Sequence, residues 1–399
     1  MACRPGNGYP VLDVPTTPIL SLQQPQPKKA RRWLSFLIGI FLGLSVVPIL
    51  IFEDANELPN WHWPAFNAII LIPALYVAVV AHELGHLIAG KLAGFDLGGL
   101  TIGGFALFKS GKRWKFRVRP TLCVGGQFCP RASRNKCVTS RYAWMVAGGP
   151  LASLLLSAIA LIVTIHWGNG AWRWIGTFFW ASLTTLISSI IPYTSALQRS
   201  DGAILLLTIR HPPKTGPLMA LIAIQSQDFE GVRPREWDRE MFDRMLTAQF
   251  DSSEFFMSQY RAYYRKLDQG SVTEALEHLE NALARSAGTP AALQHGLFLE
   301  ASAASALLHR KAEQAYVWRD RACALRKPES LDVVQAAIDM CEGRYEDAAQ
   351  LWAAAGKRAE KKGLDSGMVR FAREKWAEYE AVCREAANPS TRGTLEVLG

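Results

Sequence analysis

His82-Glu83-Leu84-Gly85-His86 stands at the end of an apolar run from Ala65 to Ala81, and this pairing decides the fold. A helix needs about 20 predominantly apolar residues to cross the hydrocarbon of a bilayer. The sequence therefore predicts a membrane-spanning helix from Ala65 to about Leu92 that carries two histidines and a glutamate.

The spacing of these residues is typical of zinc hydrolases. Positions i and i+4 project from one face of a helix, so His82 and His86 can both bind one tetrahedral Zn²⁺. Glu83 is the next residue along, which is the position of a general base that takes a proton from water. The alternative is a helix end whose histidines merely face lipid head groups, but ionisable residues inside a span persist mainly where they bind, pair or react.

Hydropathy divides the chain into an apolar part up to about residue 210 and a charged, helical remainder. The apolar part predicts four spans, at about residues 33–52, 65–92, 142–166 and 171–192. Lys28, Lys29, Arg31 and Arg32 precede the first span, and no small-residue cleavage site follows it, so it reads as an uncleaved anchor.

The loops fix an expected orientation. The loop 53–64 has no Lys or Arg, whereas the stretch 94–141 is strongly basic. By the positive-inside rule, the N-terminus, this basic loop and the C-terminal half are cytoplasmic, which predicts a multi-pass protein of the cell membrane. Glu83 lies eight residues before Lys91 and therefore roughly 12 Å below the cytoplasmic surface.

A catalytic zinc site needs a third protein ligand beside the two histidines. Asp201 is the only acidic residue between Asp96 and Asp228, and it follows the fourth span at the same membrane depth. It is therefore the candidate, with helix capping as the alternative role. His62, His166 and His211 are interpreted as interfacial or loop residues.

The ordered set of motifs resembles the site-2 protease family of intramembrane zinc metalloproteases. That family pairs an HExxH helix with a later Asp-Gly motif whose aspartate is the third ligand, here Asp201-Gly202. Its Gly-Pro segment is matched by Gly149-Pro150, so the resemblance covers about residues 65–210. It implies one Zn²⁺ ion held by His82, His86 and Asp201, Glu83 as catalytic base, and a membrane-protein substrate.

Two positions depart from the family pattern. Members often carry asparagine three residues after the Gly-Pro proline and three residues before the proline that precedes Asp-Gly. This chain has Ser153 and Ser189 there. Serine can still form a hydrogen bond, but from a shorter side chain. The departure therefore concerns the hydrogen bonds around the metal and not the ligands themselves.

The basic loop 94–141 contains a stretch in which apolar and basic residues alternate. Trp114, Phe116 and Val118 alternate with basic residues, which predicts a strand that turns back at Ser110-Gly111 onto residues 102–108. The segment 124–128 resembles the Gly-Gly strand near the family's active site, where an edge strand can pair with an unwound substrate. A plain hairpin that only covers the bundle is the alternative.

The overall prediction is an α-class, polytopic helix bundle with a small β-hairpin region and a cytoplasmic helical domain. The expected parts are a Pro-rich, basic leader (1–32), the metalloprotease domain (33–210), a linker (211–234), the helical domain (235–387) and a tail (388–399). Ala275, Ala315 and Ala348 recur 40 and 33 residues apart, which suggests a tetratricopeptide-like region that binds a protein or peptide partner.

The net charge of +9 is concentrated in the leader and the loop, so it indicates topology and contact with anionic lipid rather than nucleic-acid binding. The seven cysteines form no CxxC pair and are interpreted as free thiols. The leading function is an intramembrane metalloprotease. The alternative is a membrane-anchored adaptor with a helical protein-binding domain and an inactive or structural metal site.

Overall fold

The computed structural model describes residues 62–110, 113–118, 126–131, 139–167, 175–194, 199–211, 215–249, 253–286, 289–328, 330–363 and 365–388. The chain divides into two compact units at Ser226/Gln227, which lies within one helix. We call residues 28–226 the N-terminal unit and residues 227–399 the C-terminal unit.

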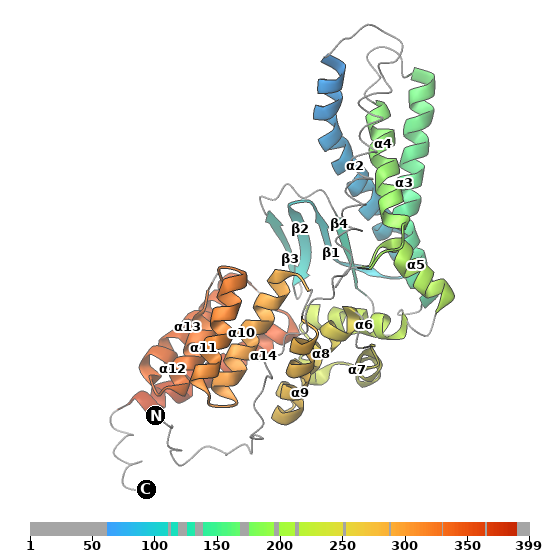
Figure 1. The fold of residues 1–399 in the computed structure, drawn as a ribbon. Helices are drawn as coiled ribbons and strands as arrows, with labels where there is room; N and C mark the ends of the chain where they lie inside the picture. The colour runs from blue at the N-terminus through green and yellow to red at the C-terminus, as the bar shows by residue number, and fades with distance from the viewer. Residues whose placement is uncertain are drawn as a thin grey trace. The chain divides into compact units, whose positions relative to one another are not determined.

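The N-terminal unit is built on three apolar helices that pack against one another (Figure 1). They are α2 (His62–Leu92), α3 (Thr139–Trp167) and α4 (Ile175–Ile190). Two short helices follow, α5 (Asp201–Arg210) and α6 (Gly216–Phe229). Small residues lie where the helices meet, since Ala74, Ala78 and Ala181 form a buried cluster.

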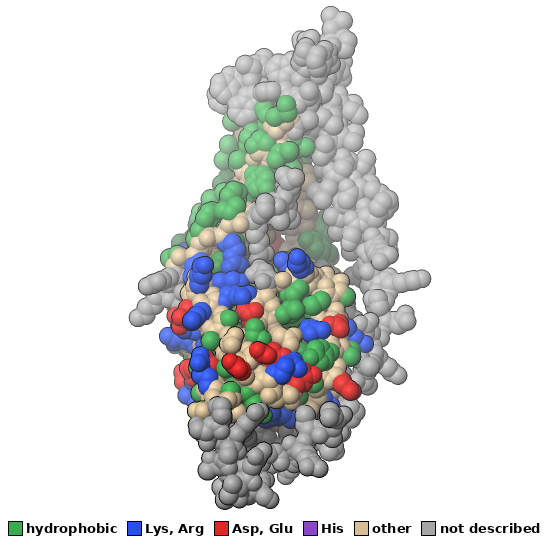
Figure 2. Space-filling view, turned by 90° about the vertical axis from the view of Figure 1, so that its left-hand side faces the viewer, with side chains coloured by type: hydrophobic (Ala, Val, Ile, Leu, Met, Phe, Trp, Pro, Cys, Tyr) green, Lys and Arg blue, Asp and Glu red, His purple; other side chains and the backbone are tan. Residues whose placement is uncertain are grey.

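The outward faces of α2 and α3 are apolar. Ile69, Ile88 and Ile165 are between 61% and 70% exposed, and Figure 2 shows hydrophobic side chains gathered along the helices of this unit. The stretches Ile69–Leu92 and Thr139–His166 are long and apolar enough to span a membrane. Apolar outward faces of this kind suit contact with the hydrocarbon of a bilayer.

The predicted count of four spans is not confirmed. Within the described residues, two helices are long enough to span a membrane. The third, α4, has 16 residues and extends only about 24 Å, which is too short. The predicted span 33–52 and the beginning of the predicted span 171–192 lie outside the described residues.

A four-stranded antiparallel sheet lies between α2 and α3 in the chain, with the order β3-β2-β1-β4. Its strands are β1 (Asp96–Ile102), β2 (Phe105–Ser110), β3 (Arg113–Val118) and β4 (Gly126–Arg131). The predicted hairpin is confirmed as β2 and β3, which pair from Phe105↔Val118 to Ser110↔Arg113.

The sheet is larger than the predicted hairpin because β1 adds a strand at its centre. The residues Leu97 to Leu100 include two glycines and do not alternate between apolar and polar side chains, so the sequence pattern does not predict this strand. Gly103 turns the chain from β1 into β2 with φ of 56°, a conformation that glycine adopts without strain. β4 begins at Gly126 and forms one edge of the sheet.

The C-terminal unit is helical throughout its described part. After a 3₁₀ turn, η4 (Pro234–Glu236), come α7 (Arg239–Leu246), α8 (Ser253–Asp268), α9 (Val272–Ala284), α10 (Ala291–Leu307), α11 (Ala312–Leu325), α12 (Asp332–Cys341), α13 (Tyr345–Lys361) and α14 (Gly367–Ala387). Consecutive helices pack against each other, and Trp352, Ile338 and Ala348 belong to one buried hydrophobic cluster of their core.

A tetratricopeptide-like repeat is not supported. Ala275, Ala315 and Ala348 are all fully buried. However, α12 has 10 residues and α14 has 21, whereas a stacked repeat needs units of similar length.

The cysteines that the structure describes form no disulfide, as predicted. They are Cys129, Cys323, Cys341 and Cys383. The other three cysteines, Cys3, Cys123 and Cys137, lie outside the described residues.

Candidate metal centre

The two histidines of α2 point their outer nitrogens at the same place. His82 Nε2 and His86 Nε2 are 3.2 Å apart, and both residues are buried at 6% and 7% exposure. Their rings meet edge to face with centroids 4.8 Å apart. The i, i+4 spacing of the helix produces this convergence directly.

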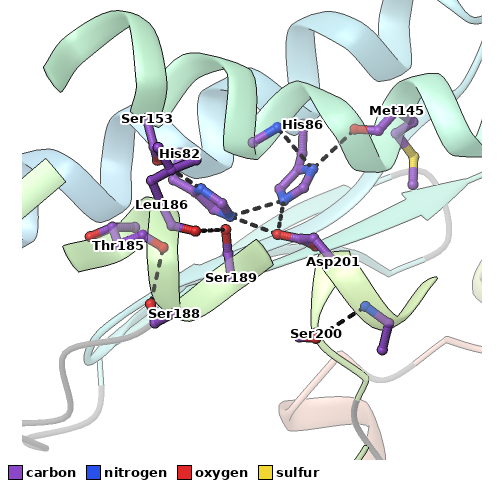
Figure 3. A network of polar contacts seen from close by, with 12 residues as sticks. His82, His86, Met145, Ser153, Thr185, Leu186, Ser188, Ser189, Ser200 and Asp201 are labelled. Carbon is purple, nitrogen blue, oxygen red and sulfur yellow. Dashed lines mark hydrogen bonds and ion pairs between the residues drawn. The ribbon is translucent and has the colours of Figure 1, made fainter. Parts of the chain in front are cut away.

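Asp201 joins the pair from the other side (Figure 3). Its Oδ2 lies 3.0 Å from His82 Nε2 and 3.5 Å from His86 Nε2. Within the described part of the chain, these three residues are the group of His, Cys, Asp and Glu side chains that is close enough to hold a metal ion. His166 and His211 lie outside this group.

The capping alternative for Asp201 is wrong because Ser200 occupies that role. The Ser200 hydroxyl accepts a hydrogen bond from the Ala203 amide at 3.2 Å and from the Tyr193 amide at 3.0 Å, and it donates to Ile191 O at 2.7 Å. Ser200 therefore caps α5 and ties its start to the end of α4. The Asp201 carboxylate is left free to face the histidines.

The donor set fits a tetrahedral cation. Ligands about 2.0–2.1 Å from a zinc ion stand about 3.3 Å from one another, and the three separations here are 3.0, 3.2 and 3.5 Å. Two imidazole nitrogens and a carboxylate oxygen face one another, an arrangement that a bound cation stabilises. His82, His86 and Asp201 could thus hold one metal ion with a position left for water.

The tautomer of His86 follows from its second contact. His86 Nδ1 lies 3.0 Å from Met145 O, and a carbonyl oxygen can only accept. The neutral ring therefore carries its proton on Nδ1 and keeps a lone pair on Nε2. The Gly149 N–H also points at Nδ1, at the longer distance of 3.3 Å, and we assign the proton to Nδ1 because Met145 O lies closer and can only accept. Nothing in the sequence predicts Met145, because its contribution is a backbone oxygen.

Gly149 makes room for both rings. A Cβ atom at this position would lie 2.3 Å from His86 Nε2 and 2.7 Å from His82 Nε2, closer than real Cβ atoms approach any atom. The Gly-Pro segment singled out in the sequence therefore has a steric reason at the centre. A larger side chain would occupy the space where the ligand atoms converge.

Glu83 is buried beside the centre with one oxygen that has no partner. The residue is 5% exposed, and its Oε2 makes no hydrogen bond within the described residues. The Phe128 amide of β4 donates to the carboxylate. A Cβ at Gly126 would lie 2.3 Å from Glu83 Oε1, so the start of β4 packs directly on this side chain. An unpaired carboxylate oxygen in a buried site is available to take a proton.

The two serines that replace family asparagines behave differently. Ser153 Oγ lies 2.9 Å from His82 Nδ1. The Ser189 hydroxyl donates to Leu186 O of its own helix at 3.0 Å and takes no part in the group (Figure 3). Sequence alone gave the two positions equal weight.

Cys129 lies on β4 next to Phe128 without joining the metal group. Burial raises the pKa of its thiol, and the charge of Glu83 raises it further. A thiol held protonated is a poor metal ligand, which agrees with the interpretation of Cys129 as a free thiol.

A comparison with protein-family models supplies the context for this geometry. The model of Peptidase family M50 matches residues 70–352, so the match extends beyond residue 210 into the C-terminal unit. No curated protein and no solved structure matches the chain. The match spans more than half of the 399 residues and includes His82, His86 and Asp201, and the chain therefore belongs to peptidase family M50, the site-2 protease family of metalloendopeptidases.

Proposed function

We propose that this metalloprotease cleaves a peptide bond in or near the transmembrane segment of a membrane protein. His82, His86 and Asp201 hold one zinc ion, and Glu83 is the general base. The observation that carries the proposal is the convergence of three ligand atoms within 4.8 Å beside a buried carboxylate oxygen without a partner.

Zinc, when bound, supplies a Lewis acid that lowers the pKa of water towards neutrality. Glu83 Oε2 accepts a proton from the attacking water and returns it to the departing amine. The Phe128 amide donates a hydrogen bond that holds Glu83 in place for this transfer. Gly126 has no side chain and so leaves room for the Glu83 carboxylate. His86 donates its Nδ1–H to Met145 O throughout, so its ring does not rotate away.

The edge strand β4 is the proposed docking site for the scissile segment. A helical peptide hides its amide bonds, and an unwound substrate can regain hydrogen bonds by pairing with a free strand edge. β4 suits this role because it lies at the edge of the sheet, with β1 as its partner among the described strands, and because the Phe128 amide contacts Glu83. Substrate paired with β4 would thus run beside the general base.

The bilayer surrounds α2 and α3 in this proposal. The exposed faces of these helices are apolar, and the proposed topology places both termini and the basic sheet region in the cytoplasm. Water then reaches Glu83 from the cytoplasmic side, roughly 12 Å below the surface. The helical domain, proposed to cover residues 235–387, binds a protein or peptide partner that recruits substrate.

Two substitutions test the proposal. Asp201→Ala should lose zinc, measured as metal per chain in the purified full-length protein, because it removes one of three ligands. Glu83→Gln should keep zinc and lose hydrolysis, because the amide cannot accept the proton. Zinc retained in full by Asp201→Ala would remove this residue from the ligand set.

The same Glu83→Gln variant separates the protease from the adaptor alternative. Membrane proteomes of cells with the wild-type chain and with Glu83→Gln are compared. Uncleaved membrane proteins should accumulate with the variant. If none accumulates, while deletion of residues 211–399 abolishes the phenotype of the cell, the adaptor function is correct instead.

A further inference from the structure

We propose that Ser153 is a positioning residue of the metal centre. Its hydroxyl oxygen accepts the Nδ1 proton of His82 and so keeps His82 Nε2 free to bind metal. This inference rests on the proposed zinc ligation and adds a residue that acts on one ligand without touching the ion.

The contact is short and fully enclosed. Ser153 Oγ and His82 Nδ1 are 2.9 Å apart, and Ser153 has no exposed surface. A neutral imidazole has one N–H, so Nε2 can ligate only when the proton is on Nδ1. In a buried site that proton needs an acceptor, because a buried donor without a partner destabilises the folded state. Ser153 supplies the acceptor.

Ser153 is itself held by two further serines. The backbone oxygen of Ser153 accepts from the Ser157 hydroxyl at 2.9 Å and from the Ser182 hydroxyl at 2.8 Å. Ser157 lies one turn along α3, whereas Ser182 belongs to α4 and has no exposed surface. The bond from α4 fixes this turn of α3, and with it the hydroxyl that faces His82.

The two histidines therefore depend on different kinds of partner. His86 donates to the backbone of Met145, which no substitution removes. His82 relies on a side chain, so its orientation is open to change at a single position. This asymmetry predicts that a substitution at Ser153 disturbs one ligand and leaves the other in place.

The test compares Ser153→Thr with Ser153→Val in the full-length protein in detergent. Threonine and valine have nearly the same shape, so the pair isolates the hydroxyl from the effect of packing. Zinc affinity is measured by competition with a chromophoric chelator. Loss of a partner of a metal-bound histidine typically weakens metal binding 10–100-fold, and we expect about this loss in Ser153→Val relative to Ser153→Thr. The absorption spectrum of the cobalt-substituted protein should shift in the valine variant alone.

Thr164→Ala is the matched control. It removes a hydroxyl that bonds to Ala160 O within the same helix and leaves both Ser153 and the acceptor of His82 in place. It should keep the zinc affinity and the cobalt spectrum of the wild type, as should Ser189→Ala. Equal zinc affinity of Ser153→Val and Ser153→Thr would overturn the role of Ser153 alone. A wild-type chain without stoichiometric zinc would overturn the proposed function, and this inference with it.

Discussion

The backbone oxygen of Gly148 lies 2.3 Å from the point that a Cβ atom of Gly85 would occupy. The relationship is reciprocal, since the oxygen of Gly85 lies 2.4 Å from the Cβ position of Gly148. Helices α2 and α3 thus meet backbone to backbone one residue before His86. This close approach brings His86 to Met145 O and His82 to Ser153.

Gly85→Ala should separate α2 from α3 and weaken the metal centre. The added methyl group meets a carbonyl oxygen of the backbone, which cannot rotate away, so the helices must move apart. Overpacking of this kind costs about 1–3 kcal/mol. We expect lower zinc affinity and a lower midpoint of thermal unfolding of the full-length protein.

Gly296→Ala is the control for this substitution. Gly296 also lies inside a helix, but a Cβ there meets no atom within 4 Å. Alanine favours the helix by about 0.8–1.0 kcal/mol over glycine, so this variant should be unchanged or more stable. Unchanged zinc affinity in Gly85→Ala would contradict the steric account of the α2–α3 crossing.

Two other glycines should separate metal binding from hydrolysis. Gly149→Ala places a methyl group against both imidazoles and should abolish zinc binding. Gly126→Ala places one against the Glu83 carboxylate, 2.3 Å from Oε1, and should retain zinc while cleavage falls sharply. Metal per chain and cleavage of a model transmembrane substrate are measured for both. Loss of zinc from Gly126→Ala, or its retention by Gly149→Ala, would refute this division.

The sequence predicts those features that depend on local spacing. His82 and His86 converge because they stand four residues apart on one helix. Asp201 could be singled out because acidic residues are absent from the apolar region around it. The β2–β3 hairpin follows from the alternation at Trp114, Phe116 and Val118.

The remaining features depend on tertiary contacts that no local pattern encodes. The rotation of α3 and α4 decides that Ser153 meets His82 while Ser189 bonds within its own helix. Tertiary contacts also decide the start of α9, where Ser271 makes no side-chain cap and Glu274 pairs with Lys266 of α8. Gly149 and Gly126 leave room for side chains of α2, and this role can be recognised only when the neighbouring residues are known.

Ser200→Ala should loosen the third ligand. The hydroxyl makes three hydrogen bonds that join the start of α5 to the end of α4. Removal of a serine cap costs about 0.5–2 kcal/mol, and Asp201 is the next residue. We expect weaker zinc binding with an increased rate of metal release, measured by transfer to a chelator. Thr208→Ala, which removes a hydroxyl bonded only within α5, is the control and should release zinc at the wild-type rate.

The helices around Glu300 in the C-terminal unit should become more stable against local unfolding as the pH falls and Glu300 takes up a proton. Burial is the largest influence on this carboxyl and raises its pKa above the ordinary value of 4.5, although the hydroxyls of Tyr264 and Tyr263 donate to it and act in the opposite direction. The folded state therefore binds the proton more tightly than the unfolded state. The resulting stability is fully present below the unfolded pKa and is lost as the pH rises through the folded pKa.

Glu300→Gln should remove this dependence, because the amide stays neutral and still offers Tyr264 an acceptor. Hydrogen exchange of the α8 and α10 backbone, corrected for intrinsic rates, is compared at pH 5 and pH 7 in the full-length protein. The gain of protection from pH 7 to pH 5 should be larger in the wild type than in the variant. Glu378→Gln removes a carboxylate that is 58% exposed and should keep the wild-type pattern. If Glu300→Gln retains the full pH dependence, another group is responsible, and the buried Asp228, whose pKa burial also raises, is the next to substitute.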